Sequence, residues 1–143
     1  METKKFFMNK LVRDKSVEIL QKRGCTHIEH YTLDDNEDYL GALAEKMVEE
    51  LEEIFDADSR EEMIEELADI EEVLAAFKDL VEISQVEVDE ARKKKKAEKG
   101  GYLGRVFIEY IDAQVGSPAY KYAQEHQEKY PEIEDVEIEE DEE

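Results

Sequence analysis

"DYLGALAEKMVEELEEIFDADSREEMIEELADIEEVLAAFKDLV", residues 38–81, spaces its apolar side chains three or four positions apart on both sides of a short polar break. This spacing is typical of one helix face, so the stretch predicts a helix over about residues 38–57 and a second one through about Val81. Ser59 and Glu62 form a capping-box pattern that opens the second helix. Because the connection is short, the two helices are expected to form an antiparallel hairpin.

The hairpin carries many carboxylates, and their positions along each helix distinguish those that share a face from those at the surface. Residues three apart lie on one face of a helix, so Glu50 pairs with Glu53 on the first helix and Glu66 with Asp69 on the second. In an antiparallel hairpin the two pairs can face each other and offer four carboxylates to a hard cation such as Mg²⁺, which prefers oxygen ligands. Glu52 points elsewhere and is predicted to be a surface residue.

An acid-rich chain also produces such spacings by chance, and a solvated helix surface is the alternative. Glu66 falls inside the apolar arc of its helix, and Glu50 lies at the edge of its own arc. Glu53 and Asp69 lie farther out. Because a glutamate directed at a core is costly unless it is paired or metal-bound, the placement favours the metal site.

The other segments are expected to add short helices around the hairpin. The stretch SVEILQKRG, residues 16–24, predicts a brief helix closed by Gly24, with Asp14 as its candidate cap. Ser84 and Glu87 repeat the capping-box pattern and predict a further helix over about residues 85–98, and a last one begins at Ser117-Pro118. Residues 104–113 fit a short strand or a helix equally well. The fold class is all-α.

Composition narrows the functional classes. The 143 residues include 41 Asp and Glu against 19 Lys and Arg, a formal charge of −22, which disfavours general binding to nucleic acid or membranes. The same charge suits divalent cations or a basic partner. Cys25 is the single cysteine, and neither a signal core nor a membrane-spanning apolar run is visible, so a cytosolic protein is expected. His27 and His30 are too few ligands for a closed zinc site.

Three motifs in order give the chain a family resemblance. The carboxylates fit E-E-x-x-E at Glu49, Glu50 and Glu53, followed by E-x-x-D at Glu66 and Asp69. NKLVRDKSVEILQKRG, residues 9–24, precedes them, and KKKKAEKGGYLGRV, residues 93–106, follows. In this order they resemble the MazG-like all-α NTP pyrophosphatase superfamily, in the phosphoribosyl-ATP pyrophosphohydrolase-like branch that opens with K-L-V-R-D-K. Ser16 and Val17 depart from the Ile-Pro that branch members often have.

The resemblance implies a fold and an activity. Members form α-helical bundles, usually dimers or tetramers, and hydrolyse nucleoside triphosphates to the monophosphate and pyrophosphate with Mg²⁺, for which Mn²⁺ is a possible substitute. The implied metal ligands are Glu50, Glu53, Glu66 and Asp69. Glu49 is a fifth catalytic candidate, for water activation or for structure. On this basis we expect a MazG-like domain over residues 1–115. Beyond the resemblance, the sequence itself predicts a helical extension over residues 116–130 and an acidic, disordered tail over residues 131–143.

Positive groups are expected to bind the polyphosphate, since electrostatic stabilisation dominates phosphoryl chemistry. The candidates are Lys10, Arg13, Lys15, Lys95, Lys99 and Arg105, with Tyr102 as a surface on which a base can stack. For the lysine run at 93–96, a solvated tract that complements the helix dipole is the alternative.

Two other functions are also compatible with the sequence. One is a non-catalytic acidic interaction protein, to which the charge of −22 and the acidic C-terminal run point. The other is a sensor that binds a nucleotide without hydrolysing it.

Overall fold

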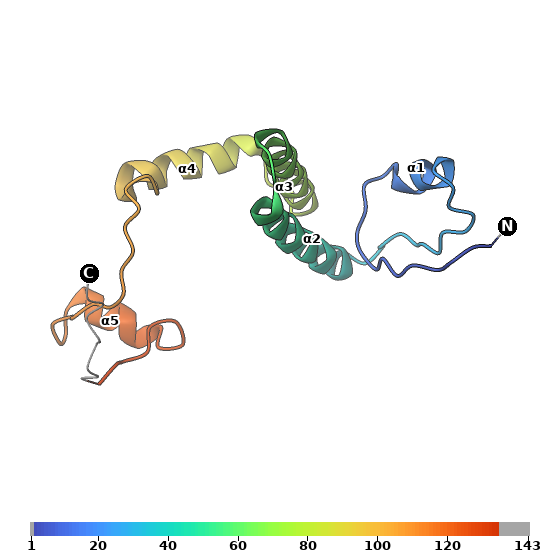
Figure 1. Cartoon of the computed structure of the whole chain (residues 1–143). Coiled ribbons are helices and arrows are strands. Elements are labelled where there is room, and N and C mark those ends of the chain that lie inside the picture. The colour runs from blue at the N-terminus through green and yellow to red at the C-terminus, as the bar shows by residue number, and fades with distance from the viewer. Residues whose placement is uncertain (1, 135–143) are drawn as a thin grey trace. The chain divides into compact units, whose positions relative to one another are not determined.

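The computed structural model describes residues 2–134, and within this range every regular element is a helix. The order is α1 (Ser16–Lys22), α2 (Asn36–Asp56), α3 (Arg60–Leu80), α4 (Gln85–Lys99) and α5 (Pro118–Glu125), as labelled in Figure 1. The predicted all-α class is therefore confirmed for the described part of the chain.

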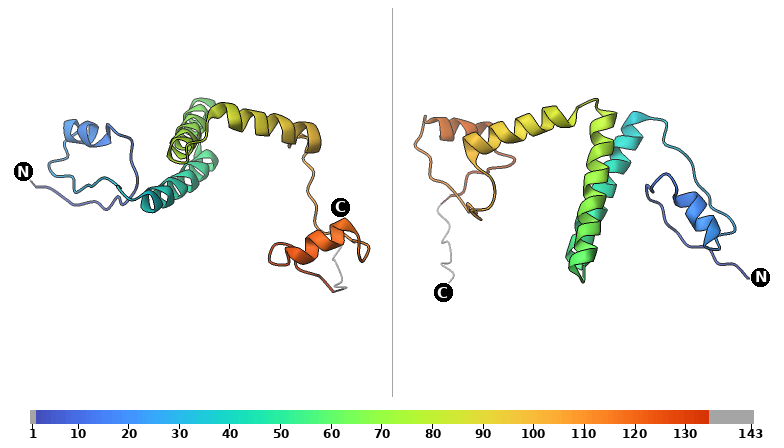
Figure 2. Two further views of the ribbon diagram at one scale, coloured as in Figure 1. Left: turned by 180° about the vertical axis from the view of Figure 1, so that it is seen from behind. Right: turned by 90° about the horizontal axis from the view of Figure 1, so that it is seen from above.

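Helices α2 and α3 form the predicted hairpin. They lie side by side and run in opposite directions in every view of Figures 1 and 2. Ser59 starts α3, because its hydroxyl accepts a hydrogen bond from the Glu62 N–H at 3.1 Å. The Glu62 carboxylate accepts from the N–H of Asp58 rather than that of Ser59, so the cap also holds the turn between the two helices.

The core of the hairpin is small. Leu43 and Val73 are the only buried apolar side chains among the described residues, and they lie fifteen positions before and fifteen after Asp58. Glu50 and Glu66 are likewise eight positions before and eight after it, so they occupy one level of the hairpin. Several apolar side chains of the hairpin remain at least 39% exposed, namely Leu40, Val48, Leu51, Phe55, Ile64, Leu67 and Leu74.

Helices α1 and α4 have no buried residues. Helix α4 has the full capping box that its sequence predicts, in which Ser84 and Glu87 bond each other's backbone, and it ends at Gly100. Helix α1 begins after Lys15 without any side-chain cap, so the predicted cap by Asp14 is wrong. The backbone reverses between residues 13 and 16 instead, where the Ser16 N–H bonds the Arg13 carbonyl.

The chain divides into two compact units, one up to Gly100 and one from Gly101 on. In the second unit the predicted start of the last helix is confirmed: Ser117 caps α5 by accepting from the Tyr120 N–H at 3.2 Å, and Pro118 takes the first position. Residues 104–113, left open between strand and helix, are neither. The proposed division at residues 115 and 130 stays a prediction, and most of the predicted tail, residues 135–143, lies outside the described residues.

No helix within residues 2–134 combines the length and apolar character that crossing a bilayer would require.

Candidate metal centre

Three of the predicted metal ligands lie together between α2 and α3. Glu50, Glu53 and Glu66 each direct one carboxylate oxygen to a common place, where these oxygens lie within 4.8 Å of one another. Glu50 is 4% exposed and Glu66 is half-buried. Of the four carboxylates that the register argument groups, the structure therefore brings three together, and Glu52 is exposed as expected.

The close approach of the three carboxyls raises the pKa of Glu66. A hydrogen bond with Glu53, followed by loss of hydration and by the charges of Glu53 and Glu50, raises the pKa of Glu66 to about 7. Protonated Glu66 can donate to Glu53, so a proton offsets part of the mutual repulsion when no cation is present.

The donor set fits a hard divalent ion. One oxygen of Glu50 and one of Glu66, both Oε2, are buried without a hydrogen-bond partner among the described residues. A buried carboxylate oxygen without a partner is costly, and a cation bound there would satisfy both atoms. The ligand class is oxygen throughout, which suits Mg²⁺ or Mn²⁺ better than softer metals.

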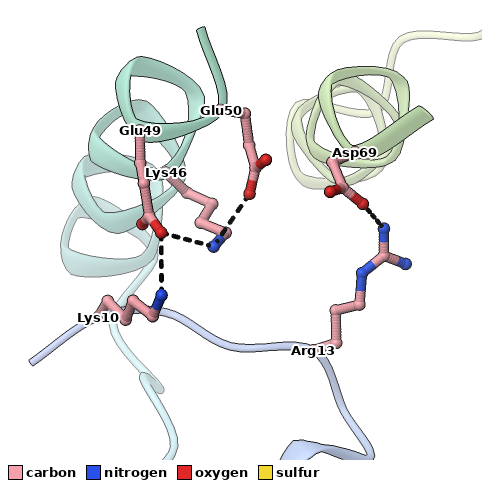
Figure 3. Close-up of polar contacts among 6 residues, drawn as sticks. All are labelled: Lys10, Arg13, Lys46, Glu49, Glu50 and Asp69. Atoms are coloured by element: carbon pink, nitrogen blue, oxygen red, sulfur yellow. Dashed lines mark hydrogen bonds and ion pairs between the residues drawn. The ribbon is translucent and has the colours of Figure 1, made fainter. Parts of the chain in front are cut away.

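The fourth predicted ligand, Asp69, is bonded elsewhere. Its Oδ1 accepts from the guanidinium of Arg13, as Figure 3 shows, and Asp69 does not belong to the group of three glutamates. Two residues predicted for different roles, one for metal and one for phosphate, thus neutralise each other in this structure.

Two lysine side chains form ion pairs with carboxylates in and next to the cluster. Lys10 donates to Glu49 at 2.9 Å, and Lys46 lies between Glu49 at 3.4 Å and Glu50 at 3.1 Å (Figure 3). Burial alone would raise the pKa of Glu49, but the hydrogen bond from Lys10 and the charges of Lys46 and Lys10 outweigh it and lower that pKa. Glu49 is therefore held in its ionised form.

Lys46 is the functional candidate that the sequence analysis missed. Burial alone would lower the pKa of its ammonium, but the hydrogen bond to Glu50 and the charges of Glu49 and Glu50 outweigh it and raise the pKa. Its side chain is 18% exposed, and it partners Oε1 of Glu50 while Oε2 has no partner. The sequence did contain a signal for this ion pair, because Lys46 lies four residues before Glu50 and therefore on the same helix face.

The N-terminal segment crosses from one helix to the other. Lys10 contacts α2 and Arg13 contacts α3, so residues 10–13 span the hairpin at the level of the acids (Figure 3). Residues 8–11 and α2 also border an open pocket of about 280 Å³, lined on the helix side by Ala42, Glu45, Lys46 and Glu49.

The other predicted phosphate and base contacts are exposed side chains. Lys15 is exposed at the start of α1, and Lys95 and Lys99 are exposed on α4, with no ion pair among the described residues. Tyr102 and Arg105 belong to the second unit, where they are exposed. Their roles as substrate ligands stay predictions.

No model of a known protein family matches the sequence, and neither a curated protein nor a solved structure matches it.

Proposed function

We propose that the protein is a divalent-cation-dependent nucleotide pyrophosphohydrolase of the MazG-like type, which cleaves a nucleoside triphosphate to the monophosphate and pyrophosphate. The observation that carries the proposal is the cluster of Glu50, Glu53 and Glu66, with two buried carboxylate oxygens that have no partner. The family assignment rests on the sequence motifs alone.

The residues that would hold the ion are Glu50, Glu53 and Glu66. When bound, Mg²⁺ or Mn²⁺ supplies neutralisation of the phosphate charge and a water of lowered pKa. Asp69 is available as a further oxygen ligand once Arg13 leaves it.

Lys10 and Arg13 are the proposed phosphate ligands. Both lie next to the acidic cluster, on a segment that contacts the two helices of the site. A polyphosphate offers each of them an acceptor of higher charge than the carboxylate it now contacts, and the guanidinium of Arg13 can bind two phosphate oxygens at once. Placing both cations on one short segment favours their simultaneous use on neighbouring phosphates.

Glu49 fits a structural role better than proton transfer. Its pKa is lowered, and efficient general bases have a pKa near the working pH. We therefore assign Glu49 to anchoring Lys10 and Lys46, which leaves the cluster glutamates for the ion.

The direct test is pyrophosphate release from a panel of canonical and modified nucleoside triphosphates, with and without Mg²⁺ or Mn²⁺. Glu50→Gln should abolish turnover, since it removes one charge from the most buried carboxylate of the cluster. Glu52→Gln is the matched control, because it makes the same change on the same helix at an exposed position. It should retain the wild-type rate.

Binding measurements separate this function from its alternatives. Mn²⁺ binding that is lost in Glu50→Gln, together with nucleotide binding but no hydrolysis, would identify a sensor. A chain that binds neither the metal nor any nucleotide while its helices are intact would refute the proposal.

The proposal includes self-association. The buried apolar core of the described residues consists of two side chains, whereas much of the apolar surface of α2 and α3 is exposed. An oligomer would cover part of this surface, as the resemblance implies.

A further inference from the structure

The connecting segment ahead of α5 has the composition of a strand but no partner. Residues 106–111 read VFIEYI, and β-branched and aromatic residues are the types most enriched in strands. Among residues 2–134, no backbone or side-chain hydrogen bond involves residues 106–113. The segment precedes α5 and has no regular secondary structure (Figure 1).

Its side chains are also unusually exposed. Val106 is 84% exposed, Phe107 88% and Ile108 68%, and Tyr110 and Ile111 are each more than half exposed. A stretch of unpaired backbone with exposed apolar side chains is a template for pairing with another strand. Burial of these side chains would favour such pairing.

Charge and shape favour a second copy of the same segment as the occupant. In an antiparallel pair related by a two-fold axis, residues of equal parity face each other, so one residue of the segment must face itself. If that residue is Phe107, then Val106 faces Ile108 of the second copy, and Arg105 faces Glu109 of the second copy. Within residues 105–109, every apolar residue then faces an apolar one, and both charges face the opposite charge.

The neighbouring registers are less favourable. A pair centred on Ile108 sets Phe107 against Glu109 of the second copy, which places an apolar ring against a charge. A pair centred on Glu109 sets two like charges against each other, which is destabilising. The register centred on Phe107 is the one that the sequence favours.

We propose that residues 106–108 form an antiparallel strand pair with the same residues of a second copy, centred on Phe107 and closed at each end by an Arg105–Glu109 ion pair. This inference concerns the second unit and is independent of the proposed catalytic function. Arg105 has a φ of 55°, so the ladder begins at Val106, and Arg105 contributes its long side chain from the end of the strand.

Cross-linking of the full chain tests the register. Cys25, the single cysteine, is replaced by Ser, and Phe107→Cys or Val115→Cys is added to that background. Residues that face each other across an antiparallel pair bring their Cβ atoms close to the separation of a disulfide. Phe107→Cys should therefore oxidise to a dimer at least about tenfold faster than Val115→Cys, which is 79% exposed but lies outside the pair. Equal rates would refute the pairing.

Reversing the charges of Arg105 and Glu109 distinguishes specific ion pairs from the general repulsion between two acidic chains. In the Phe107→Cys background, Glu109→Arg should slow dimer formation about tenfold, although it makes the acidic chain less negative. The matched control, Glu128→Arg, makes the same charge change at an exposed position of the same unit and should not slow it. Arg105→Glu should also slow dimer formation, and the double exchange should restore the original rate. Failure of the double exchange to restore it, with each single change slowing it, would exclude the ion pairs.

Amide hydrogen exchange shows whether the segment pairs with a second copy or with the chain's own C-terminal residues. Exchange at residues 106–108 should slow as the protein concentration rises, both in the full chain and in a chain ending at Glu134. Slow exchange that is independent of concentration, and that is lost in the shortened chain, would assign the place to the chain's own C-terminal residues and refute the proposal.

Discussion

Glu66 connects the acidity of the site to the stability of the hairpin. Its pKa is raised from 4.5 to about 7, first by its hydrogen bond with Glu53. Between these two pH values the folded chain retains a proton at this position that the unfolded chain has lost. Stability then falls as the pH rises through this window, because the folded state binds more protons than the unfolded state.

The free energy of unfolding of the metal-free protein should therefore fall from about pH 4.5 to about pH 7 and level off above it. Urea unfolding at a series of pH values measures this slope, with chelator present throughout. Glu66→Gln should flatten it, because the amide does not titrate, whereas Glu65→Gln on the exposed side should retain it. The same slope in Glu66→Gln and wild type would assign the titration to other groups.

Lys46 is the partner that Glu50 has when no metal is bound. Glu50 has a 5% exposed side chain, and Lys46 satisfies one of its two oxygens. Lys46→Met should lower the free energy of unfolding in chelator by about 1–3 kcal/mol, because it leaves the second oxygen without a partner as well.

The matched control for Lys46→Met is Lys22→Met. It removes an exposed Lys–Glu pair with the same charge change, since Lys22 and Glu18 are 74% and 65% exposed, and it should cost less than about 0.5 kcal/mol. Saturating Mn²⁺ should restore part of the stability lost in Lys46→Met, because the ion then partners Glu50. Equal losses in the two variants would show that the Lys46–Glu50 pair stabilises the fold no more than an exposed ion pair does.

At the level of elements, sequence prediction succeeded where local signals agree. Capping by Ser59, Ser84 and Ser117 coincides with a change in apolar spacing, so three helix starts were predictable. The local signal at Asp14 misled, because an acid near a helix start need not face its N–H groups. Residues 104–113 were undecidable for a physical reason: a strand is stabilised by a partner, and the sequence of one strand does not identify that partner.

The candidate site shows the same limit. Register placed Glu50, Glu53 and Glu66 on facing sides of a hairpin, and local spacing sufficed for that. The pairing of Arg13 with Asp69 joins residues 56 positions apart, and spacing within one helix carries no information about it. Lys46 was overlooked because a lysine within an acid-rich helix is expected at the surface.

Two serine caps should differ in what they stabilise. Ser59→Ala should lower the free energy of unfolding by about 1 kcal/mol, because this cap holds the turn of the hairpin that contains the core. Ser84→Ala removes an equivalent cap from α4, which has no buried residue. Its effect should be confined to faster amide exchange within α4, with an unchanged urea midpoint. A lowered midpoint in Ser84→Ala would mean that α4 unfolds together with the hairpin.

For the whole molecule, the balance is between a small core and a large net charge. Two buried apolar side chains stabilise the described part of the chain, while a formal charge of −22 disfavours compaction through self-repulsion. Any cation should therefore stabilise the fold to some extent, by screening. Stabilisation by Mg²⁺ is informative about the site only after this general effect has been removed.

The site-specific part is measurable at constant ionic strength. Replacing NaCl by MgCl₂ or MnCl₂ at matched ionic strength should raise the unfolding midpoint of the wild type, since ligand at a hundred times its Kd adds about 2.7 kcal/mol to the free energy of unfolding. Glu50→Gln should lose this excess because it removes a buried ligand, whereas Glu52→Gln should keep it, with the same net charge. Because both variants experience the same diffuse screening, an equal excess in the two would show that divalent ions act on the whole acidic surface rather than at the three glutamates.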